Sequence, residues 1–463
     1  MAHVKPQANP NYDTYIKLTK NADFILLHFT DMLGYLKGRT IPAEQAKNAL
    51  TEGVTFDGSS MIGGTTIEDS DMIMKPDPST FTAYPHYFYD KSVAGFICDV
   101  KKPDGEQFED DSRYILKIAT KKMLAEGYQA TAAAELEFYL VKRNEQGEIE
   151  PVENHLIDKQ RYFDNSPGRD ITEHYRMELS NTLSTMGITV ERQHHEVGSA
   201  QNEITVRYSD PLTTSDNIMR HKFAAKATAD KKYGWTATFM PKPWHGKAGS
   251  GMHIHLGLWN PKKKQNPFYD QKGYAGISQE CRYFIGGLLE HAKALCAIVA
   301  PSVNSYKRLV PGYEAPVYVA WSKRNRSALV RVPAFDPSNG KEARIEFRCP
   351  DPLCNPYLTY TVAFEAGMDG VRKKIDPGDP VEVNIYHLTG EERKNLAVSV
   401  LPTSLNEALE EWKNDDICIR ALGTRVASKY AELKKQEWKE YEPHLPTDAN
   451  EVTSWERQKY LFA

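Results

Sequence analysis

The chain has 463 residues, 40% of them hydrophobic and 26% charged, so it can bury a large core and differs in composition from disordered proteins. Its 58 lysines and arginines nearly balance 62 aspartates and glutamates, and the net charge of -4 excludes a general attraction to nucleic acid or anionic membranes. We therefore expect no nucleic-acid or membrane partner, and any ligand must be held by a local site.

Short apolar runs separated by turn residues fill the region from Asp23 to Val100, with one helix expected after Pro42. Runs of this length predict the strands of a small β-rich domain. A charged stretch with Pro and Gly over residues 101–111 predicts a linker. We therefore expect an N-terminal domain at 15–105 and a C-terminal domain at 112–463.

Beyond the linker, helical and strand patterns alternate. A cap at Asp111 or Ser112 predicts a helix that ends at Gly127, and Asp170 with Glu173 predicts the start of another. Because strands lie between these helices, the larger domain is expected to be α+β. Trp455, Tyr460, Leu461 and Phe462 end the chain, and so apolar a tail favours either docking on another subunit or packing within its own chain.

Four segments of the larger region carry polar side chains at every second position. Side chains alternate between the two faces of a strand, so each segment would place its polar side chains on one face. In chain order, these side chains are Glu135 and Glu137 in 134–140, Glu203 and Thr205 in 201–206 with Glu196 upstream, His253 and His255 in 251–256, and Glu342, Arg344, Glu346 and Arg348 in 342–348.

The residue types in these rows indicate metal ions. A sheet with one solvated face would also alternate, but a solvated face usually mixes Lys, Thr, Ser and Gln. Carboxylates that line one cavity would raise one another's pKa, so cations must compensate them. Carboxylates with one or two imidazoles and no thiolate favour Mg²⁺ or Mn²⁺ over zinc. Such ions usually bind phosphate oxygens, which indicates nucleotide chemistry.

An arginine-rich region supports this interpretation. Residues 304–316 have the Pro and Gly content of a loop, and residues 323–331 add Arg324, Arg326 and Arg331. The planar guanidinium suits phosphate and carboxylate groups, although a solvated charged surface is the competing interpretation. The sequence contains no G-x-x-x-x-G-K-[ST] motif, so a nucleotide would not be held by a P-loop.

The cysteines and the apolar pattern predict where the protein is found. None of the six cysteines has C-x-x-C spacing, which favours buried thiols in a reducing cytoplasm. Residues 1–17 contain Asn, Pro and Gln where a signal peptide would need an apolar run, and no stretch of about 18 apolar residues suggests a membrane span. We expect a soluble, cytoplasmic protein.

Several motifs occur together in an order typical of one family. They are Phe56 to Ser60, Glu135 to Phe138, His194 to Val197, Gly249 to His255, Asn304 to Pro316, Asn325 to Ala328 and Arg344 to Pro352. The chain resembles type I glutamine synthetases of the bacterial and archaeal kind from about Asp23 to its end. The resemblance implies a small β-grasp domain followed by a larger domain with a curved antiparallel sheet flanked by helices. It also implies a homododecamer of two stacked hexameric rings with active sites at subunit interfaces.

The same resemblance implies a ligase reaction. ATP would drive the joining of ammonium to the γ-carboxylate of L-glutamate through γ-glutamyl phosphate, giving L-glutamine, ADP and phosphate. Two to three Mg²⁺ or Mn²⁺ ions would bind at each active site, with ATP as a substrate. Proteins that regulate nitrogen metabolism would be candidate partners.

Matching the motifs residue by residue implies a role for each site residue. One metal ion would be held by Glu137, Glu196 and Glu203, and the other by Glu135, His253 and Glu346. ATP would contact Glu191, His255, Arg326, Arg331 and Lys341, and the substrate would contact Gly249, Arg308, Glu314 and Arg348. Catalytic roles would fall to Asp57, Ser60, Glu314 and Arg326. Asp57 and Ser60 would come from the neighbouring subunit to form the ammonium site, and Glu314 would lie on a closing flap.

Three positions depart from the family pattern. Ala248 stands where many members have Asn, residues 198–200 replace a Pro-Gly turn, and Gly257 stands where Ser is common. The departures leave open a related ligase that uses a polyamine or another amine. A zinc hydrolase based on His253 and His255 and a catalytically silent relative are further alternatives. Tyr386 matches the position at which some relatives are adenylylated.

Overall fold

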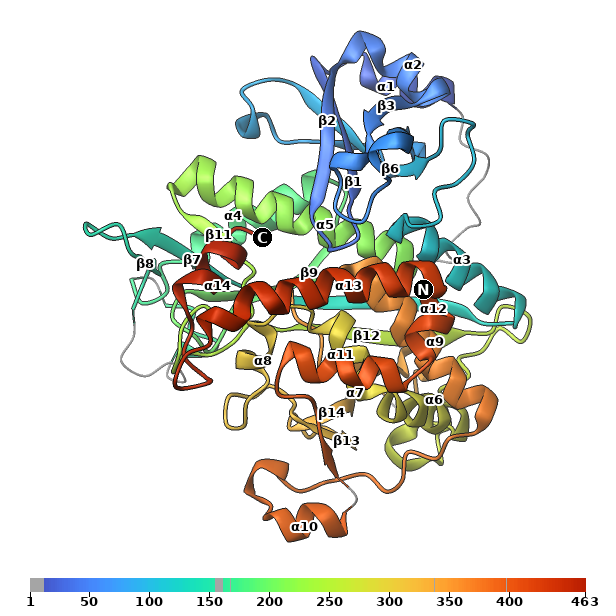
Figure 1. The fold of residues 1–463 in the computed structure, drawn as a ribbon, viewed down its shortest axis with the longest axis vertical. Coiled ribbons are helices and arrows are strands. Elements are labelled where there is room, and N and C mark those ends of the chain that lie inside the picture. The colour runs from blue at the N-terminus through green and yellow to red at the C-terminus, as the bar shows by residue number, and fades with distance from the viewer. Residues whose placement is uncertain (1–11, 155–160, 167, 337, 397) are drawn as a thin grey trace.

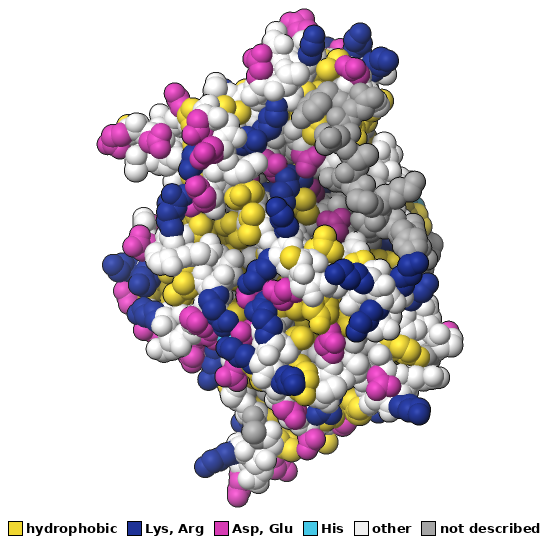
Figure 2. Space-filling view, turned by 90° about the vertical axis from the view of Figure 1, so that its right-hand side faces the viewer, with side chains coloured by type: hydrophobic (Ala, Val, Ile, Leu, Met, Phe, Trp, Pro, Cys, Tyr) yellow, Lys and Arg dark blue, Asp and Glu magenta, His cyan; other side chains and the backbone are white. Residues whose placement is uncertain are grey.

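The computed structural model describes residues 12–154, 161–166, 168–336, 338–396 and 398–463 (Figure 1). Residues 1–11, which contribute to the expectation about a signal peptide, lie outside the described residues. Among the helices of the described ranges, we find none with the length and apolar character that a membrane span requires. Acidic and basic side chains are interspersed over the face in Figure 2, in keeping with their nearly equal numbers.

The N-terminal domain is a β-grasp domain in which a mixed sheet packs against short helices. Its elements are α1 (Tyr12–Thr19), β1 (Phe24–Thr30), β2 (Leu36–Pro42), α2 (Ala46–Glu52), β3 (Val54–Asp57), β4 (Asp71–Pro76), β5 (Thr82–Ala83) and β6 (Val93–Lys101). The strand order is β2-β1-β6-β4-β3, with β5 also paired to β6 and with β1 and β6 parallel. The runs near residues 24, 71 and 95 form β1, β4 and β6 as expected.

Strand β1 connects the small domain to the large one through its two faces. Ile25, Leu27 and Phe29 pack into a small core with α2, whereas Leu26 points into the large core of the catalytic domain. The period-two alternation of a strand therefore divides one apolar run between two cores. The hairpin of β1 and β2 extends toward the larger domain in Figure 1.

The larger domain contains a curved sheet. Its strands are β7 (Gln129–Arg143), β8 (Ile149–Pro151), β9 (Val190–His195), β10 (Gln201–Val206), β11 (Thr236–Thr238), β12 (Met252–Trp259), β13 (Tyr318–Lys323), β14 (Ala328–Val332), β15 (Ile345–Phe347) and β16 (Ser399–Val400). The order is β16-β13-β14-β15-β12-β7-β10-β9, with β8 and β11 also paired to β7. The pairs are antiparallel except for β13 and β14, which are parallel, so the expectation of an antiparallel sheet needs that correction.

Helices flank this sheet. They are α3 (Ser112–Ala125), α4 (Glu173–Thr185), α5 (Pro211–Thr228), α6 (Gln279–Glu290), α7 (Ala292–Val299), α8 (Ser305–Arg308), α9 (Pro356–Lys373), α10 (Gly390–Asn395), α11 (Leu405–Asn414), α12 (Ile417–Leu422), α13 (Thr424–Tyr441) and α14 (Ser454–Tyr460). The Asp111 side chain caps α3 by accepting the N–H of Arg113 at 3.0 Å. Helix α13 runs across the middle of the view in Figure 1, and α10 lies at the far end from the N-terminal domain.

Three expectations about local structure were wrong in detail. Thr172, and not Asp170, is the N-cap of α4, because the Asp170 carboxylate is bonded to the Thr172 hydroxyl and to the Arg176 guanidinium. The strand expected over 342–348 is only β15, since residues 340–342 form a 3₁₀ turn. The expected loop 304–316 begins with the short helix α8.

The apolar tail packs within its own chain. Tyr460 and Leu461 are buried, the Tyr460 hydroxyl donates to Glu437 at 2.6 Å, and the Trp455 ring contacts Tyr441. Phe462 remains 57% exposed. Of the two interpretations of the tail, packing within the chain is therefore the one observed, while docking of Phe462 on another subunit stays a prediction. The domain boundaries at 15–105 and 112–463 also stay predictions.

Candidate active site

The register of the large sheet places the polar rows side by side. Strand β7 supplies two carboxylates, and each lies opposite a polar residue of a neighbouring strand: Glu137 opposite Glu203 of β10, and Glu135 opposite His253 of β12. One strand further out, Glu346 of β15 lies opposite His255. The apolar alternates, such as Leu136 and Ile254, lie in the core. One polar face of the sheet thus gathers the acidic and imidazole groups that the alternation predicts.

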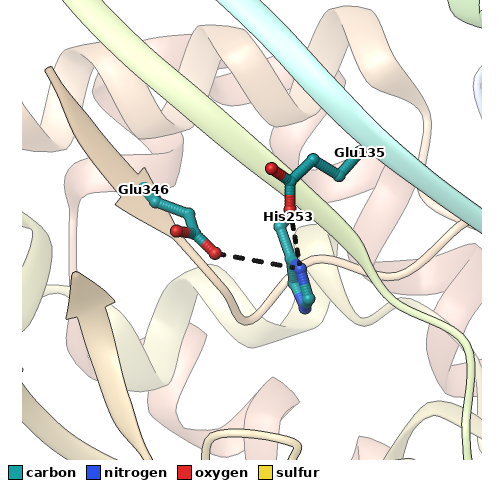
Figure 3. Close-up of side chains that lie close together, drawn as sticks. All are labelled: Glu135, His253 and Glu346. Atoms are coloured by element: carbon teal, nitrogen blue, oxygen red, sulfur yellow. Dashed lines mark ion pairs between the residues drawn. The ribbon is translucent and has the colours of Figure 1, made fainter. Parts of the chain in front are cut away.

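The first cluster consists of Glu135, His253 and Glu346, whose donor atoms lie within 4.8 Å of one another (Figure 3). His253 Nδ1 is 3.5 Å from a Glu135 oxygen and 3.8 Å from a Glu346 oxygen. Burial and the positive charge of Arg348 lower the pKa of His253 to about 4, so the imidazole is neutral at neutral pH. A neutral imidazole between two carboxylates can bind a metal ion.

The two carboxylates of this cluster are held in the ionised form. Burial opposes ionisation of Glu135, but hydrogen bonds with His253 and His255 hold its pKa well below the usual range. Burial likewise opposes ionisation of Glu346, but the charge of Arg348 lowers its pKa to about 2. Arg348 Nη1 donates to Glu346 at 2.6 Å, and Arg331 forms a second ion pair with the same carboxylate. Both oxygens of Glu346 therefore face cationic groups.

The second cluster consists of His194, Glu196 and Glu203, again with donor atoms within 4.8 Å of one another. His194 Nε2 lies 2.9 Å from Glu196 Oε1. Burial and then the charges of Glu135 and Glu196 raise the pKa of Glu203 well above its usual value. Such repulsion between carboxylates is relieved when a divalent cation binds.

Glu137 lies in the same cavity but is bonded to neighbouring polar groups. It accepts the backbone N–H of Gly251 at 2.8 Å and the amide N–H of Gln201 at 3.3 Å. Burial and the charge of Glu196 raise its pKa to about 8. The structure thus brings Glu135, His253 and Glu346 together as expected, whereas in the second cluster His194, and not the expected Glu137, joins Glu196 and Glu203.

A cavity of about 610 Å³ opens over this polar face. Among the expected site residues, it is lined by Glu135, Glu137, Glu196, Glu203, Gly249, His253, His255, Arg308, Glu314, Arg326, Arg331 and Arg348. Arg308 is buried at its wall, where its two Nη groups donate to the carbonyls of Cys349 and Arg348 at 2.8 and 3.1 Å. Carboxylates on the floor and arginines on the walls suit an anionic substrate bound through cations.

A second cavity of about 390 Å³ adjoins the first, since Glu135, Arg192, His255 and Arg344 line both. Glu191 and Lys341, the remaining residues expected at ATP, line this second cavity. Its wall also contains Leu258, Trp259 and Ala343, and it is therefore more apolar than the first. An apolar pocket beside a charged one suits a ligand with a flat ring at one end and phosphates at the other.

Two glycines allow the side chains of the first cavity to come together. A Cβ atom at Gly251 would lie 2.6 Å from Arg308 Nη2 and 2.9 Å from His253 Nε2. At Gly249 it would lie 2.8 Å from Arg308 Cγ and 2.9 Å from the carbonyl oxygen of Pro241. The glycines in the Gly-Ser-Gly motif are thus required by the close approach of Arg308 and, at position 251, of a candidate metal ligand.

Asp57 and Ser60 line neither cavity. They lie on the surface of the N-terminal domain, where Asp57 accepts the hydroxyl hydrogens of Ser59 and Ser60 at 2.6 Å. These bonds lower the pKa of Asp57 below its usual value. The chain therefore presents an ionised carboxylate on its surface, away from its own two cavities. Glu314 lies in an exposed segment and has a positive φ of 65°.

Some residues of the cavity were not assigned a role from the sequence. Tyr162 and Phe163 line the cavity, and the Tyr162 hydroxyl lies 3.3 Å from Arg326 Nη1. His194 could have been found from the sequence, because it lies two positions after Arg192 in the segment 190–195 and therefore on the same face of the strand. Tyr162 offered no signal, since it lies outside any helix or strand of regular pattern.

Tyr386, the residue compared with an adenylylation site, is partly buried. Its hydroxyl donates to the carbonyl of Ala315 at 2.6 Å, and its ring contacts Tyr318. A nucleotidyl transfer to this oxygen would need that hydrogen bond to break. Modification of Tyr386 stays a prediction.

Two family models match successive parts of the chain. The family model described as "Glutamine synthetase, beta-Grasp domain" matches residues 21–103, and "Glutamine synthetase, catalytic domain" matches residues 109–460. The chain is 45% identical over 443 residues to a Thermotoga maritima protein named glutamine synthetase, with 96% of this chain and 97% of that protein covered. It is also 45% identical over 456 residues to a Pyrococcus furiosus protein of the same name, with 96% and 98% covered.

Solved structures also resemble nearly the whole chain. The structure named "GmaS/ADP complex-Conformation 1" superposes with a TM-score of 0.83 at 28% identity, covering 97% of this chain and 99% of that one. "Apo GmaS without ligand" gives a TM-score of 0.82 at 29% identity. From the two matching domain models, the near full-length relatives and the acidic cavity, we conclude that the chain belongs to the glutamine synthetase family.

Proposed function

We propose that this chain catalyses the ATP-dependent ligation of ammonium to the γ-carboxylate of L-glutamate, giving L-glutamine, ADP and phosphate. One observation carries the proposal. In a chain 45% identical to glutamine synthetases over nearly its full length, residues of two carboxylate and imidazole clusters line one cavity with four of the expected arginines. These arginines are Arg308, Arg326, Arg331 and Arg348. The clusters fit divalent cations, and the arginines fit the carboxylates and phosphates of the substrates.

The donor sets fit Mg²⁺ or Mn²⁺. Each combines carboxylate oxygens with a single imidazole, and thiolates are not among them. Glu135, His253 and Glu346 would hold one ion, and Glu196 and Glu203, with Glu137 and His194 beside them, would hold the other, with room in the cavity for a third. Bound ions would neutralise the charge that accumulates on the phosphoryl oxygens.

The arginines and the second cavity would orient the two substrates for the first step. Lys341 and Glu191 would contact the nucleotide in the smaller cavity, with Arg326 and Arg331 at its phosphates. Arg308 and Arg348 would hold glutamate. A γ-carboxylate oxygen of glutamate then attacks the γ-phosphorus of ATP, and the bond from that phosphorus to the bridging oxygen breaks. ADP departs, and γ-glutamyl phosphate is formed.

In the second step, ammonium loses a proton to a carboxylate, and Asp57 of a neighbouring subunit and Glu314 are the candidates. Ammonia attacks the acyl carbon, the protonated nitrogen of the adduct gives a second proton to one of these carboxylates or to the departing phosphate, and phosphate leaves with the electrons of the C–O bond. Residues 309–316 would close over the acyl phosphate, because water would otherwise hydrolyse it. The exposed position of Glu314 at the cavity supports this role.

The proposal includes an assembly. Asp57 and Ser60 lie outside both cavities of their own chain, which supports active sites completed by a neighbouring subunit. We infer a homododecamer of two stacked hexameric rings, as the sequence resemblance implies, with nitrogen-regulatory proteins as candidate partners. Six buried, free cysteines support a reducing compartment, the cytoplasm.

An assay of the purified protein tests the function. Phosphate release and glutamine formation are measured with ATP, Mg²⁺ and glutamate, and ammonium is compared with putrescine and ethylamine. We expect turnover with ammonium and formation of glutamine. Turnover with an organic amine alone would instead support the related ligase left open by Ala248, and amide hydrolysis without ATP would contradict both.

A further inference from the structure

The C-terminal helix α14 carries a carboxylate that is completely buried. Glu456 is 0% exposed, and one of its oxygens accepts the N–H and the hydroxyl of Thr453 at 2.8 and 2.9 Å, which forms a capping box at the start of the helix. A capping box needs only these local partners. The Glu456 carboxylate nevertheless continues into the catalytic domain.

Glu456 contacts Asn304, which precedes the short helix α8, and Lys307 within that helix. Its Oε2 atom lies 2.7 Å from Nζ of Lys307, whose side chain is 5% exposed, and its Oε1 atom accepts the amide N–H of Asn304 at 2.8 Å. Asn304 in turn bonds to both backbone groups of Lys242 at 2.7 and 2.9 Å. The buried carboxylate thus joins α14, α8 and the segment at residue 242.

These contacts end directly beside the substrate cavity. Arg308 follows Lys307 and lines the cavity, as do Tyr313 and Glu314 in the next segment. Lys242, held by Asn304, lies with its Nζ atom 3.8 Å from the centre of the Tyr313 ring. Glu456 is therefore connected to the cavity wall both through Lys307 and through Asn304.

Helix α8 cannot hold this orientation by itself. It has four residues, and an isolated helix of this length is unstable in water. The direction of the Arg308 side chain consequently depends on contacts of α8 with the rest of the chain. An ion pair with both partners buried has a defined geometry and is little screened by salt, so it is suited to this task.

We propose that Glu456 is a positioning residue for Arg308 and for the flap that follows it. This inference rests on the proposed function, in which Arg308 holds glutamate. The contacts of Glu456 lead to the first cavity, whereas Glu191 and Lys341 line the second, so loss of the Glu456 carboxylate alters glutamate binding and leaves ATP binding unchanged. The C-terminal helix is thus part of the support of the active site.

Glu456→Gln tests the proposal. Lys459→Gln is the matched control on the same helix, where a partly exposed ion pair with Glu440 is lost. We expect the KM for glutamate to rise about 10-fold in Glu456→Gln while the KM for ATP changes less than about 2-fold, as for loss of one charge-assisted hydrogen bond. The control keeps both values. Unchanged KM values for glutamate in a folded Glu456→Gln protein overturn the proposal.

The double variant Lys307→Met with Glu456→Gln separates positioning from an unpaired buried charge. If Glu456→Gln lowers the melting temperature, removing both charges restores it, because no uncompensated charge of Lys307 is left in the core. The proposal predicts that the glutamate KM stays raised in the double variant. If the KM returns to the wild-type value, the single variant acted through the unpaired charge, and the proposal is wrong.

Hydrogen exchange distinguishes a failure of this inference from a failure of the proposed function. We expect faster exchange of the backbone amides over 305–315 in Glu456→Gln than in the wild type and the control. This readout does not depend on catalysis. A wild type that forms no glutamine refutes the proposed function alone, whereas equal exchange rates in all three proteins refute the role of Glu456.

Discussion

Among individual residues, Glu137 combines burial with the proximity of the charged Glu196, which together raise its pKa to about 8. The protonated form therefore predominates at neutral pH in the metal-free protein. A divalent cation requires the carboxylate form, so binding lowers this pKa and releases a proton. We expect the affinity for Mg²⁺ to increase as the pH rises from about 6 to about 8.

Calorimetry at pH 7 in two buffers of different ionisation enthalpy measures this proton release. The heat of Mg²⁺ binding should differ between the buffers in the wild type, and much less in Glu137→Gln. A heat that is independent of the buffer would contradict the raised pKa.

The raised pKa of Glu137 also affects folding in the metal-free protein. As the pH rises from about 5 to about 8, the free energy of unfolding decreases, because the Glu137 carboxyl ionises at lower pH in the unfolded chain than in the folded one.

Glu137→Gln also separates the contribution of this carboxylate to catalysis from its contribution to folding. The amide oxygen can still accept the Gly251 N–H, but a neutral amide binds a cation weakly. We expect kcat/KM to fall at least about 100-fold, roughly 3 kcal/mol, with a melting temperature equal to or above that of the wild type. Glu145→Gln on the exposed turn after β7 is the control. Near-normal turnover would remove Glu137 from the metal site.

Between elements, the contact of Tyr162 with Arg326 joins the segment 161–166 to the turn between β13 and β14. The hydroxyl lies 3.3 Å from Arg326 Nη1, while the ring packs edge-on against His194. Tyr162→Phe removes the hydrogen bond and keeps the ring. Since Arg326 is expected at the ATP phosphates, the loss should reduce kcat about 5-fold, or roughly 1 kcal/mol.

The control for this prediction is Tyr89→Phe, which changes an exposed ring of the N-terminal domain. Steady-state rates at saturating glutamate and ammonium, together with thermal melting, provide the measurement. The two variants should melt at the same temperature as the wild type. A kcat of Tyr162→Phe equal to that of the control would show that the hydroxyl does not orient Arg326.

For the whole molecule, the position of Asp57 leads to a test of shared active sites. Asp57 lies on the N-terminal domain, and Glu137 lies in the cavity of the catalytic domain. If each site takes Asp57 from a neighbour, coexpressed Asp57→Ala and Glu137→Gln chains form some sites with both residues intact. Random mixing in a closed ring leaves about a quarter of the sites complete.

We therefore expect each variant alone to be nearly inactive and the mixture to recover about a quarter of the wild-type activity per site. Mixing the separately purified assemblies without subunit exchange serves as the control and should recover none. Equal inactivity of the coexpressed chains, in assemblies shown to contain both, would place the whole active site in one chain.

Local patterns in the sequence predicted much of the fold and of the candidate site. The cap at Asp111 and the carboxylate row of Glu135 and Glu137 follow from short-range geometry, because a helix cap and the two faces of a strand depend only on residues near in the chain. The family resemblance then assigned the residues that share the first cluster. For Glu346, the sequence alone also indicated the correct face, although its strand is only three residues long.

The tertiary structure decided which strands are neighbours, and therefore which polar groups meet. The parallel pairing of β13 with β14, the ion pair of Arg331 with Glu346, and the contact of Glu456 with α8 join residues that are distant in the chain or depend on strand order. Such pairings are selected by the packing of the whole core, which local periodicity does not encode. The sequence by itself determined which face each side chain occupies, and the tertiary structure determined what lies across from it.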